Sequence, residues 1–518
     1  MTAGWGRTAA VLLLIAAATT LAYAPSFSVP FQFDDYARII DNVPLQQGDY
    51  RVALAWLGSS RLLPSLTLIG NYLAGGEQVG GYHAVNFALH LLASLAVFAL
   101  VRLACRAPGL RDSAAARQPL AAAGLAALIM ACHPLQTQAV TYIIQRAAVM
   151  AALCYVAAVA CYLRARLTQL GALGGRPRGW FAAALALGAA ALLSKENAAS
   201  LPFAVLITEL VVVGGRPSRR ALAVGAAGFG ALILLPLAWK IATWTPAMPG
   251  ATSGWFEYVT GAILAQGAGA PTATPLAYLL TQWTVIPRYL ALLVLPWGQS
   301  VDHDVAIAAA ATPAVLLGLA LLLGLLAAGV WLARRAPLAG YGLLWIFVAL
   351  GVESSVLPIA DAMMEHRLYL AMPGFGMLVA APFAWLAGRA PRAAAVTALL
   401  LGAALVGLTH ARNLVWQSPI GLWLDAAEKA PGKGRVLVNY GVALHGAGRL
   451  EEAARQYCRA LRLDPQLTLA SENLELALDQ LGLLEDIPAR AVHRPVGPDV
   501  APGTVVIEAD LIGGYCDR

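Results

Sequence analysis

Long apolar runs, separated by short polar clusters, are the feature of this sequence that most limits how it can fold. Of its 518 residues, 59% are hydrophobic and 12% are charged, and the mean hydropathy is +0.68. A soluble globular domain carries roughly 25% charged residues. Runs of about 20 apolar residues are long enough to cross a bilayer as helices. The sequence therefore predicts an all-α, polytopic membrane domain.

About eleven such runs are candidate transmembrane helices. They cover residues 8–24, 83–104, 118–132, 137–163, 179–194, 198–214, 220–239, 310–333, 338–352, 367–388 and 393–410. A further apolar segment, 277–297, contains two prolines and Arg288. We expect this segment to form a re-entrant or interfacial hairpin that does not cross the membrane.

Arginine clusters in the loops between these runs set the expected orientation. Cytoplasmic loops of membrane proteins carry an excess of Lys and Arg. Placing the clusters inside gives a cytoplasmic N-terminus and an exterior C-terminus. The net charge of +7 then reflects membrane orientation, and it does not indicate binding to nucleic acid.

Six polar clusters fall on the exterior side of this topology. They are Asp34-Asp35, His133, Lys195-Glu196, Arg288, Asp302-His303-Asp304 and Glu365-His366-Arg367. Charge within or against a bilayer is costly and is therefore typical of functional sites. Their gathering at one face predicts a single ionisable site there. A transporter fits less well, because its site would lie near the midplane.

The chemistry of these clusters suits a lipid-linked phosphate and an acceptor hydroxyl. Asp34 and Asp35 could deprotonate a hydroxyl, although a helix cap or a solvated loop would also explain them. Positive groups would bind the phosphate through charge-assisted hydrogen bonds. The candidates for this role are Arg146, Lys195, Arg288, His366 and Arg367. A sugar carried on a polyprenyl phosphate would need both the carboxylates and the positively charged residues.

The remaining polar residues are further site candidates. Lys195 and Glu196 could pair with each other, and His133, His303 and Glu365 have no assigned role. Asp35, Asp302 and Asp304 would suit Mg²⁺ or Mn²⁺ if a metal is bound, because these ions prefer oxygen ligands. A solvated loop is the alternative for residues 302–304. No cofactor is assigned.

After residue 412 the composition becomes that of a soluble helical module. Residues 437–465 follow the tetratricopeptide pattern, and an offset of about 34 residues maps Tyr457, Ala460 and Pro465 onto Trp423, Ala426 and Pro431. We therefore expect about two repeats within residues 413–483, and leave 484–518 unassigned. Such repeats bind peptides or proteins in a groove; packing against the membrane domain is the alternative.

Two cysteines, Cys458 and Cys516, lie in this tail. They would pair if the tail is in an oxidising compartment, and the sequence leaves this open.

Several motifs, taken in order, resemble the transmembrane-and-TPR protein O-mannosyltransferases and their bacterial relatives. They are FDDYARIIDN, HPLQTQAVTYIIQRAAVMAA, LLSKENAASLP, LLTQWTVIPRYLALLVLPWGQSVDHDV and ESSVLPIADAMMEHRLYLAMPGFG. The resemblance implies a GT-C membrane domain over residues 1–412, a polyprenyl-phosphate sugar donor and inversion at the anomeric carbon. It also implies that Asp34 and Asp35 match the family's aspartate in the first exterior loop, and that Glu365, His366 and Arg367 lie near the donor phosphate.

The resulting hypothesis is a glycosyltransferase of the bacterial inner membrane with its repeats in the periplasm. It would transfer a sugar to an exterior hydroxyl, for example of a protein Ser or Thr. Transfer to a glycan or lipid is the alternative enzymatic reading. A membrane scaffold whose repeats recruit partners is the non-enzymatic one.

Overall fold

The chain divides into two compact units in a computed structural model. The structure describes residues 2–58, 61–215, 273–483 and 516. The first unit comprises residues 1–299 and 305–414, and the second comprises 300–304 and 415–518. The described part of both units is helical. We call them the membrane unit and the repeat unit.

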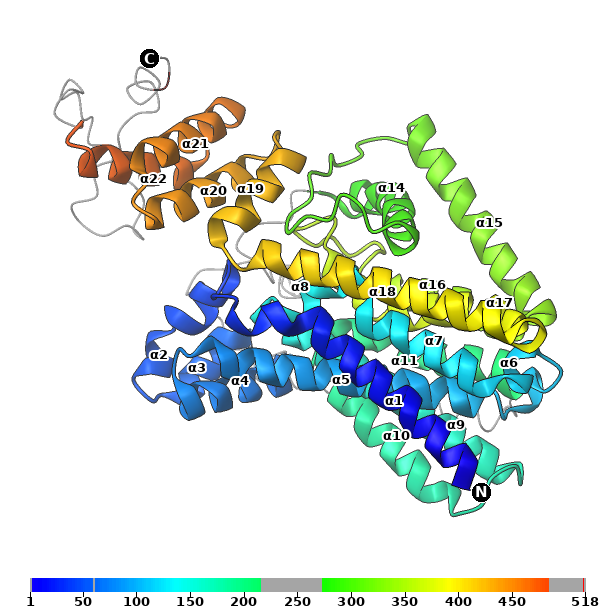
Figure 1. The fold of residues 1–518 in the computed structure, drawn as a ribbon. Coiled ribbons are helices and arrows are strands. Elements are labelled where there is room, and N and C mark those ends of the chain that lie inside the picture. Colours follow the sequence, from blue (N-terminus) through cyan, green and yellow to red (C-terminus); the bar gives the residue numbers. More distant parts are fainter. Residues whose placement is uncertain (1, 59–60, 216–272, 484–515, 517–518) are drawn as a thin grey trace, which may run out of the picture. The chain divides into compact units, whose positions relative to one another are not determined.

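The membrane unit is a bundle of helices joined by short irregular segments (Figure 1). Its longer helices are α1 (Thr2–Tyr23), α5 (Val79–Ala104), α7 (Pro119–Cys132), α9 (Arg146–Gln169), α10 (Pro177–Leu192), α14 (Pro275–Val294), α15 (Pro313–Arg335), α16 (Pro337–Leu350), α17 (Met372–Arg389) and α18 (Pro391–Trp416). Shorter helices are α2 (Val43–Gln46), α3 (Tyr50–Gly58), α4 (Leu62–Gly75), α6 (Ala114–Arg117), α8 (Thr137–Val140) and α11 (Leu201–Ile207).

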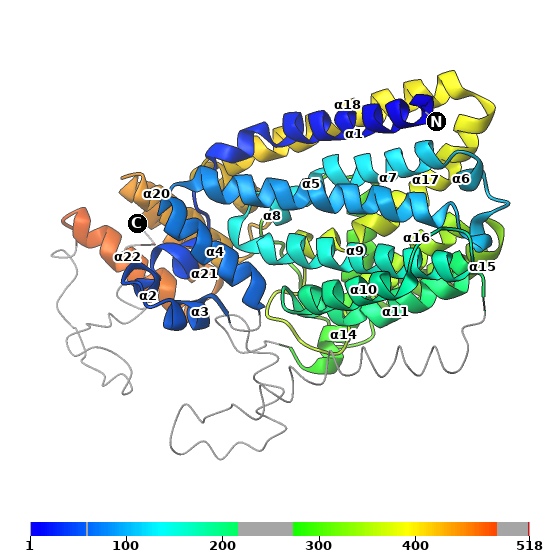
Figure 2. The same cartoon turned by 90° about the horizontal axis from the view of Figure 1, so that it is seen from below.

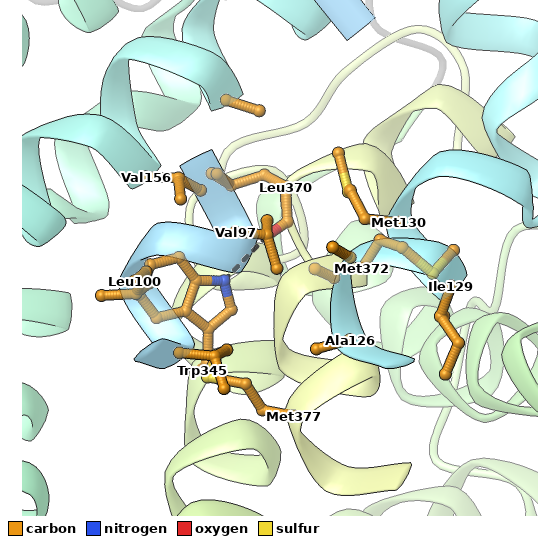
Figure 3. Packing of buried hydrophobic residues seen from close by; sticks show 14 of the residues in the cluster. Val97, Leu100, Ala126, Ile129, Met130, Val156, Trp345, Leu370, Met372 and Met377 are labelled. Carbon is orange, nitrogen blue, oxygen red and sulfur yellow. Dashed lines mark hydrogen bonds between the residues drawn. The ribbon is translucent and has the colours of Figure 1, made fainter. Parts of the chain in front are cut away.

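The core of the bundle forms where α5, α7, α9, α16 and α17 meet (Figure 3). Trp345 of α16 is buried there, and its indole Nε1 donates a hydrogen bond to the Leu370 carbonyl at 2.9 Å. Val97, Val156 and Met377 lie in the same cluster. A buried indole N–H needs such a partner, because an unmatched donor would cost free energy.

Close approach of α16 and α17 depends on two glycines. A Cβ atom added at Gly342 would collide with the Gly374 carbonyl, and one at Gly374 would collide with the Gly342 carbonyl. Small residues at crossings of this kind let helix backbones approach closely in membrane bundles.

The expected number of membrane spans differs from the helices that the structure describes. Six described helical segments are long and apolar enough to cross a membrane, or seven if α7 and the bent segment after it form one span. Helices α10 and α16 occur where spans were predicted, but they have 16 and 14 residues, short of the roughly 20 that a span needs. The predicted span at 220–239 lies outside the described residues.

The segment predicted as a hairpin at 277–297 forms one continuous helix instead. Helix α14 runs through Pro287. A proline inside a helix removes one hydrogen bond but does not always end the helix, so the expectation of a break was wrong.

The polar loops and the basic loops of the membrane unit lie at opposite ends of the bundle. Figure 2 shows α8 and the helices α2 to α4 towards one end, with α6 and the N-terminus of α1 at the other. The irregular segments that carry His133 and His366 pack against each other and against α8, whereas the segment that follows Lys195 packs against α9, α10, α11 and α16. The structure thus brings the His133 and His366 segments together, and the membrane face on which they lie stays a prediction.

The repeat unit contains four helices that pack in sequence order. They are α19 (Pro419–Lys429), α20 (Gly434–Gly446), α21 (Leu450–Leu463) and α22 (Thr468–Gln480). Gly441 of α20 lies against the ring of Tyr457 in α21, where a Cβ atom would collide with the ring. The pattern residues therefore pack as expected for paired repeat helices. Cys458 and Cys516 form a disulfide with a Cα–Cα distance of 5.3 Å.

Asp302 is part of the repeat unit and anchors residues 300–304 to it. Its carboxylate accepts hydrogen bonds from Lys433 Nζ at 2.6 Å and from Arg435 Nε and Nη2 at 2.8 Å. Lys433 also donates to the His303 carbonyl at 2.9 Å. Burial alone would raise the pKa of Asp302, but Arg435 and Lys433 hold it below its ordinary value of 3.8. The carboxylate of Asp302 is thus paired with two basic residues of the repeat unit.

We expect Gly342→Ala to destabilise the membrane unit by about 1–3 kcal/mol, because the added methyl group would push α16 away from α17. Thermal unfolding in detergent would measure the loss. Gly324→Ala in α15 is the matched control, since open space surrounds that position. Equal melting temperatures for both variants would contradict this account of the crossing.

We expect Asp302→Asn to loosen residues 300–304, because the change removes the negative charge that Lys433 and Arg435 share. Limited proteolysis of the full chain should cut this segment faster in the variant than in wild type. The depressed pKa means that the wild-type contact persists above the ordinary aspartate value and is lost as pH falls through the lowered one. Asp304→Asn, at an exposed position, should cut like wild type.

Candidate active site

The two neighbouring carboxylates of the first loop have different surroundings. Asp34 is exposed, whereas Asp35 is 1% exposed. Oδ2 of Asp35 accepts from the Gln32 N–H at 3.0 Å, and Oδ1 accepts from the Ile144 N–H at 2.9 Å. Asp35 therefore ties the loop to the segment before α9, and Asp34 is the carboxylate that a ligand can reach.

The backbone directly before Asp34 has an uncommon conformation. Phe33, directly before it, has a φ of 46°, a left-handed value that is strained for a phenylalanine. The Asp34 N–H donates to the Tyr142 hydroxyl at 2.9 Å. Strain of this kind persists where surrounding contacts enforce it, and it often marks functional sites.

Burial raises the pKa of Asp35 to about 7, although the N–H groups of Gln32 and Ile144 favour the ionised form. A carboxyl with this pKa is partly protonated near neutral pH. Its charge state therefore changes near neutral pH.

A second group of charges surrounds Glu353, which follows α16. Oε1 of Glu353 lies 2.7 Å from Nζ of Lys195, and Oε2 accepts from Asn197 Nδ2 at 3.3 Å. Glu353 is 8% exposed and Lys195 is 3% exposed. Burial alone would raise the pKa of Glu353, but Lys195 and Arg367 hold it below its ordinary value of 4.5. The carboxylate is thus ionised.

Arg367 approaches the same group from the segment before α17. Nη1 donates to the Tyr278 hydroxyl at 3.3 Å, and that hydroxyl in turn donates to the Glu353 carbonyl at 2.8 Å. Nη2 donates to the Asp361 carbonyl at 2.6 Å. These are neutral acceptors, so no carboxylate contacts the guanidinium directly among the hydrogen bonds and ion pairs described.

Several buried polar atoms of this group have no hydrogen-bond partner among the described residues. They are His366 Nδ1, Asn197 Oδ1, Ser354 Oγ and Arg61 Nε. Burial, together with the charges of Lys195 and Arg367, lowers the pKa of His366 well below 6.5, so its ring is neutral. Unmatched buried polar groups are costly, and several of them around one cationic group indicate a site for a polar ligand.

An apolar cavity of about 220 Å³ opens between α14, α15 and α16. Leu290, Leu322, Ile346 and other apolar side chains line it, and Ser354 is its polar member. Ser354 directly follows Glu353 in the chain. We call the residues Arg61, Lys195, Glu353, His366 and Arg367 the cationic cluster.

Both parts of the site are tied to one short stretch of chain. Asp34 and Asp35 bond to Tyr142 and Ile144, and the His366 N–H donates to Gln138 Oε1 at 2.8 Å. The carboxylates and the cationic cluster therefore share a common support in residues 138–144.

Arg146, predicted as a phosphate ligand, is fully buried. Its Nε donates to Asn86 Oδ1 at 2.6 Å, its Nη1 to Thr67 at 3.1 Å and its Nη2 to the Tyr82 carbonyl at 3.0 Å. Each of its three nitrogens has a protein acceptor, so these contacts tie α9 to α4 and α5.

His133 and Glu365 also serve local structure. His133 Nδ1 accepts from the Leu135 N–H, and Nε2 bonds to the Leu293 carbonyl at 3.0 Å. Glu365 accepts from Gln299 Nε2 at 3.0 Å. These contacts position the segments on either side of the cationic cluster.

Two other predicted residues lie at exposed positions. Arg288 is exposed on α14. Glu196 pairs with Arg61 at 3.7 Å, rather than with Lys195.

The suggested metal ligands are divided between the two units. Asp35 and Asp302 have the partners given above, and they belong to different units. In the described parts of the chain, no group of three or more His, Cys, Asp or Glu side chains is arranged to hold a metal ion.

Sequence reasoning missed Glu353, Arg61 and Ser354. Glu353 and Ser354 directly follow the apolar run of α16, and a charge at the edge of such a run is the signal that could have identified them. Arg61 has no comparable signal, because only the fold brings it to Lys195 and His366.

Comparison with known proteins gives relatives over most of the sequence. The chain is 27% identical to protein O-mannosyl-transferase TMTC4 of Mus musculus over 86% of its length and 65% of that protein. It is 26% identical to protein O-mannosyl-transferase Tmtc3 of Drosophila melanogaster over 78% of its length and 48% of that protein. The chain thus spans less than two thirds of the length of either relative.

No family model matches the sequence, and no solved structure matches it. The resemblance expected from the motifs is nevertheless confirmed: over most of its length this chain is homologous to proteins named as protein O-mannosyl-transferases of the TMTC family, at 27% and 26% identity.

Proposed function

We propose that this chain is a membrane glycosyltransferase that moves a sugar from a polyprenyl-phosphate carrier to a hydroxyl group on the exterior face. The names of its relatives point to mannose as the sugar and to protein as the acceptor. A GT-C fold and a bacterial inner membrane belong to the same proposal.

The observation that carries the proposal is the cationic cluster, together with an apolar cavity whose polar lining residue, Ser354, directly follows Glu353 in the chain. Lys195 and Arg367 supply positive charge, and His366 and Ser354 supply buried polar atoms that lack partners among the described residues. A lipid phosphate needs both features, because its chain is apolar and its headgroup is anionic. Charge-assisted hydrogen bonds to phosphate are strong in such a buried setting.

Asp34 supplies the other half of the reaction. In the proposed step, its carboxylate takes the proton of the acceptor hydroxyl while the hydroxyl oxygen bonds to the anomeric carbon. The bond from that carbon to the phosphate oxygen breaks, and its electron pair stays on the phosphate. Lys195 and Arg367 stabilise the charge that develops there. Attack opposite the leaving group gives inversion.

Asp35 and Arg146 act as positioning residues in this scheme. Asp35 holds the first loop against residues 143 and 144, and Arg146 holds α9 against α5 through Asn86 and Tyr82. Arg288, which is exposed, is a further phosphate ligand in the proposal. Its substitution should then lower the affinity for the sugar donor.

The repeat unit fits a role in holding the acceptor on the same side of the membrane. Tetratricopeptide helices form grooves for peptides, and the Cys458–Cys516 disulfide supports an oxidising compartment such as the periplasm.

We expect Asp34→Asn to lower sugar transfer by about 10²–10⁴-fold, because it removes the general base. Purified protein would be supplied with polyprenyl-phosphate mannose and a Ser/Thr-containing peptide, and the mannosylated peptide would be counted. Asp41→Asn, at an exposed position in the same loop, is the matched control and should keep wild-type activity.

Other outcomes of this assay separate the alternatives. Transfer to a glycan or lipid, with none to peptide, would replace the protein acceptor. Equal cellular phenotypes for wild type and Asp34→Asn, with no transfer in vitro, would favour a scaffold and overturn the proposal.

We expect Lys195→Met to weaken binding of a prenyl phosphate by about 10–100-fold, the effect of losing one charged hydrogen bond of roughly 1.5–3 kcal/mol. Isothermal titration in detergent would measure it. Arg51→Met, which changes an exposed arginine of α3, should bind like wild type. Unchanged affinity in a folded Lys195→Met variant would place the phosphate elsewhere.

A further inference from the structure

Glu353 presents an unexpected charge in a cluster that should receive an anion. A carboxylate placed among the ligands of a phosphate would repel it. Yet Glu353 lies 2.7 Å from Lys195 and close enough to Arg367 to interact with it electrostatically. The contacts of Glu353 therefore have to be explained together with those of the phosphate site.

The side chain of Glu353 is weakly tethered apart from the contact with Lys195. Its other partner is Asn197 Nδ2 at 3.3 Å, which is a long hydrogen bond. The residue lies in the irregular segment between α16 and Glu365, outside any helix. A side chain with one strong partner can change rotamer once that partner has another anion to bind.

The ammonium of Lys195 also has few partners. The structure gives its ammonium one anionic partner among the described side chains, Glu353, although an ammonium has three N–H donors. A phosphate oxygen could replace the carboxylate without leaving the ammonium unpaired. Breaking this pair without replacement would be costly, because a buried charge would lose its partner.

We propose that Glu353 is a built-in competitor for the lipid phosphate: its carboxylate occupies Lys195 when the donor is absent, yields it when the donor binds and returns to it as the lipid phosphate product leaves. This inference rests on the proposed function. It assigns to the same site a residue that regulates phosphate binding and release.

The charges of donor and product make such a competitor useful. A sugar–phosphate diester carries one negative charge, whereas the monoester product carries about −1.5 to −2 at neutral pH. A purely cationic site would hold the product more tightly than the donor. A carboxylate at Glu353 repels the extra charge and so favours product release.

The test measures binding and turnover in the full-length protein with Glu353→Gln. This variant keeps the shape of the side chain and removes the charge. We expect a short-chain prenyl phosphate to bind about tenfold more tightly than to wild type, and we expect kcat for sugar transfer to fall because the product leaves slowly. The inhibition constant of the prenyl phosphate should decrease more than KM for the sugar donor.

The matched control is Glu77→Gln, which neutralises an exposed carboxylate between α4 and α5. It should leave prenyl-phosphate affinity and kcat within about twofold of wild type. If Glu353→Gln does not fold, Glu353→Asp shortens the reach to Lys195 and should give tighter binding in the same direction.

The outcomes separate the two proposals. Weaker or unchanged prenyl-phosphate binding in Glu353→Gln, while Lys195→Met still loses affinity, would overturn the role of Glu353 alone. Equal binding by wild type and Lys195→Met would instead show that the phosphate site itself is misplaced.

Discussion

The buried ion pair between Lys195 and Glu353 is the interaction around which the candidate site is built. It joins the end of α10 to the end of α16, two helices far apart in the sequence. Charges at the edge of an apolar bundle are costly unless they are paired. Once this pair is fixed, Arg367, His366 and Asn197 have a common centre. The candidate site therefore forms where the bundle pairs the buried charges of Lys195 and Glu353.

The cost of burying an unpaired charge also explains why Asp34 and Asp35 in the first loop have different surroundings. Asp35 is buried, and both of its carboxylate oxygens accept hydrogen bonds from backbone N–H groups, whereas Asp34 is exposed beside Tyr142. One carboxylate thus builds the loop, and its neighbour lies at an exposed position. The shared support in residues 138–144 then connects this carboxylate to the cationic cluster.

Much of the fold could be predicted from the sequence, because apolar runs and repeat patterns are local signals. Helices α1, α5, α15 and α18 occur where apolar runs predicted them, and the repeat helices follow the Tyr457 and Pro465 pattern. The continuity of α14 through Pro287 could not be predicted, since tertiary packing decides whether a proline ends a helix. Span counting was also unreliable, because α10 and α16 have only 16 and 14 residues, fewer than the roughly 20 that a span needs.

The site was predictable as a set of loops but not as a set of contacts. Lys195, His366 and Arg367 were identified because charge next to apolar runs is conspicuous. The burial of Arg146 against Asn86, the pairing of Asp302 with Lys433 and the place of Glu353 all depend on residues distant in sequence. Only the folded chain shows that these charges already have partners.

The central claim is that the cationic cluster receives the phosphate of a lipid-linked donor. A density map of the full-length protein with bound polyprenyl phosphate would test it most directly. The account predicts phosphate oxygens within hydrogen-bonding distance of Lys195 and Arg367, with the prenyl chain entering the cavity between α14, α15 and α16. Phosphate density away from both residues, with the Lys195–Glu353 pair intact, would contradict it.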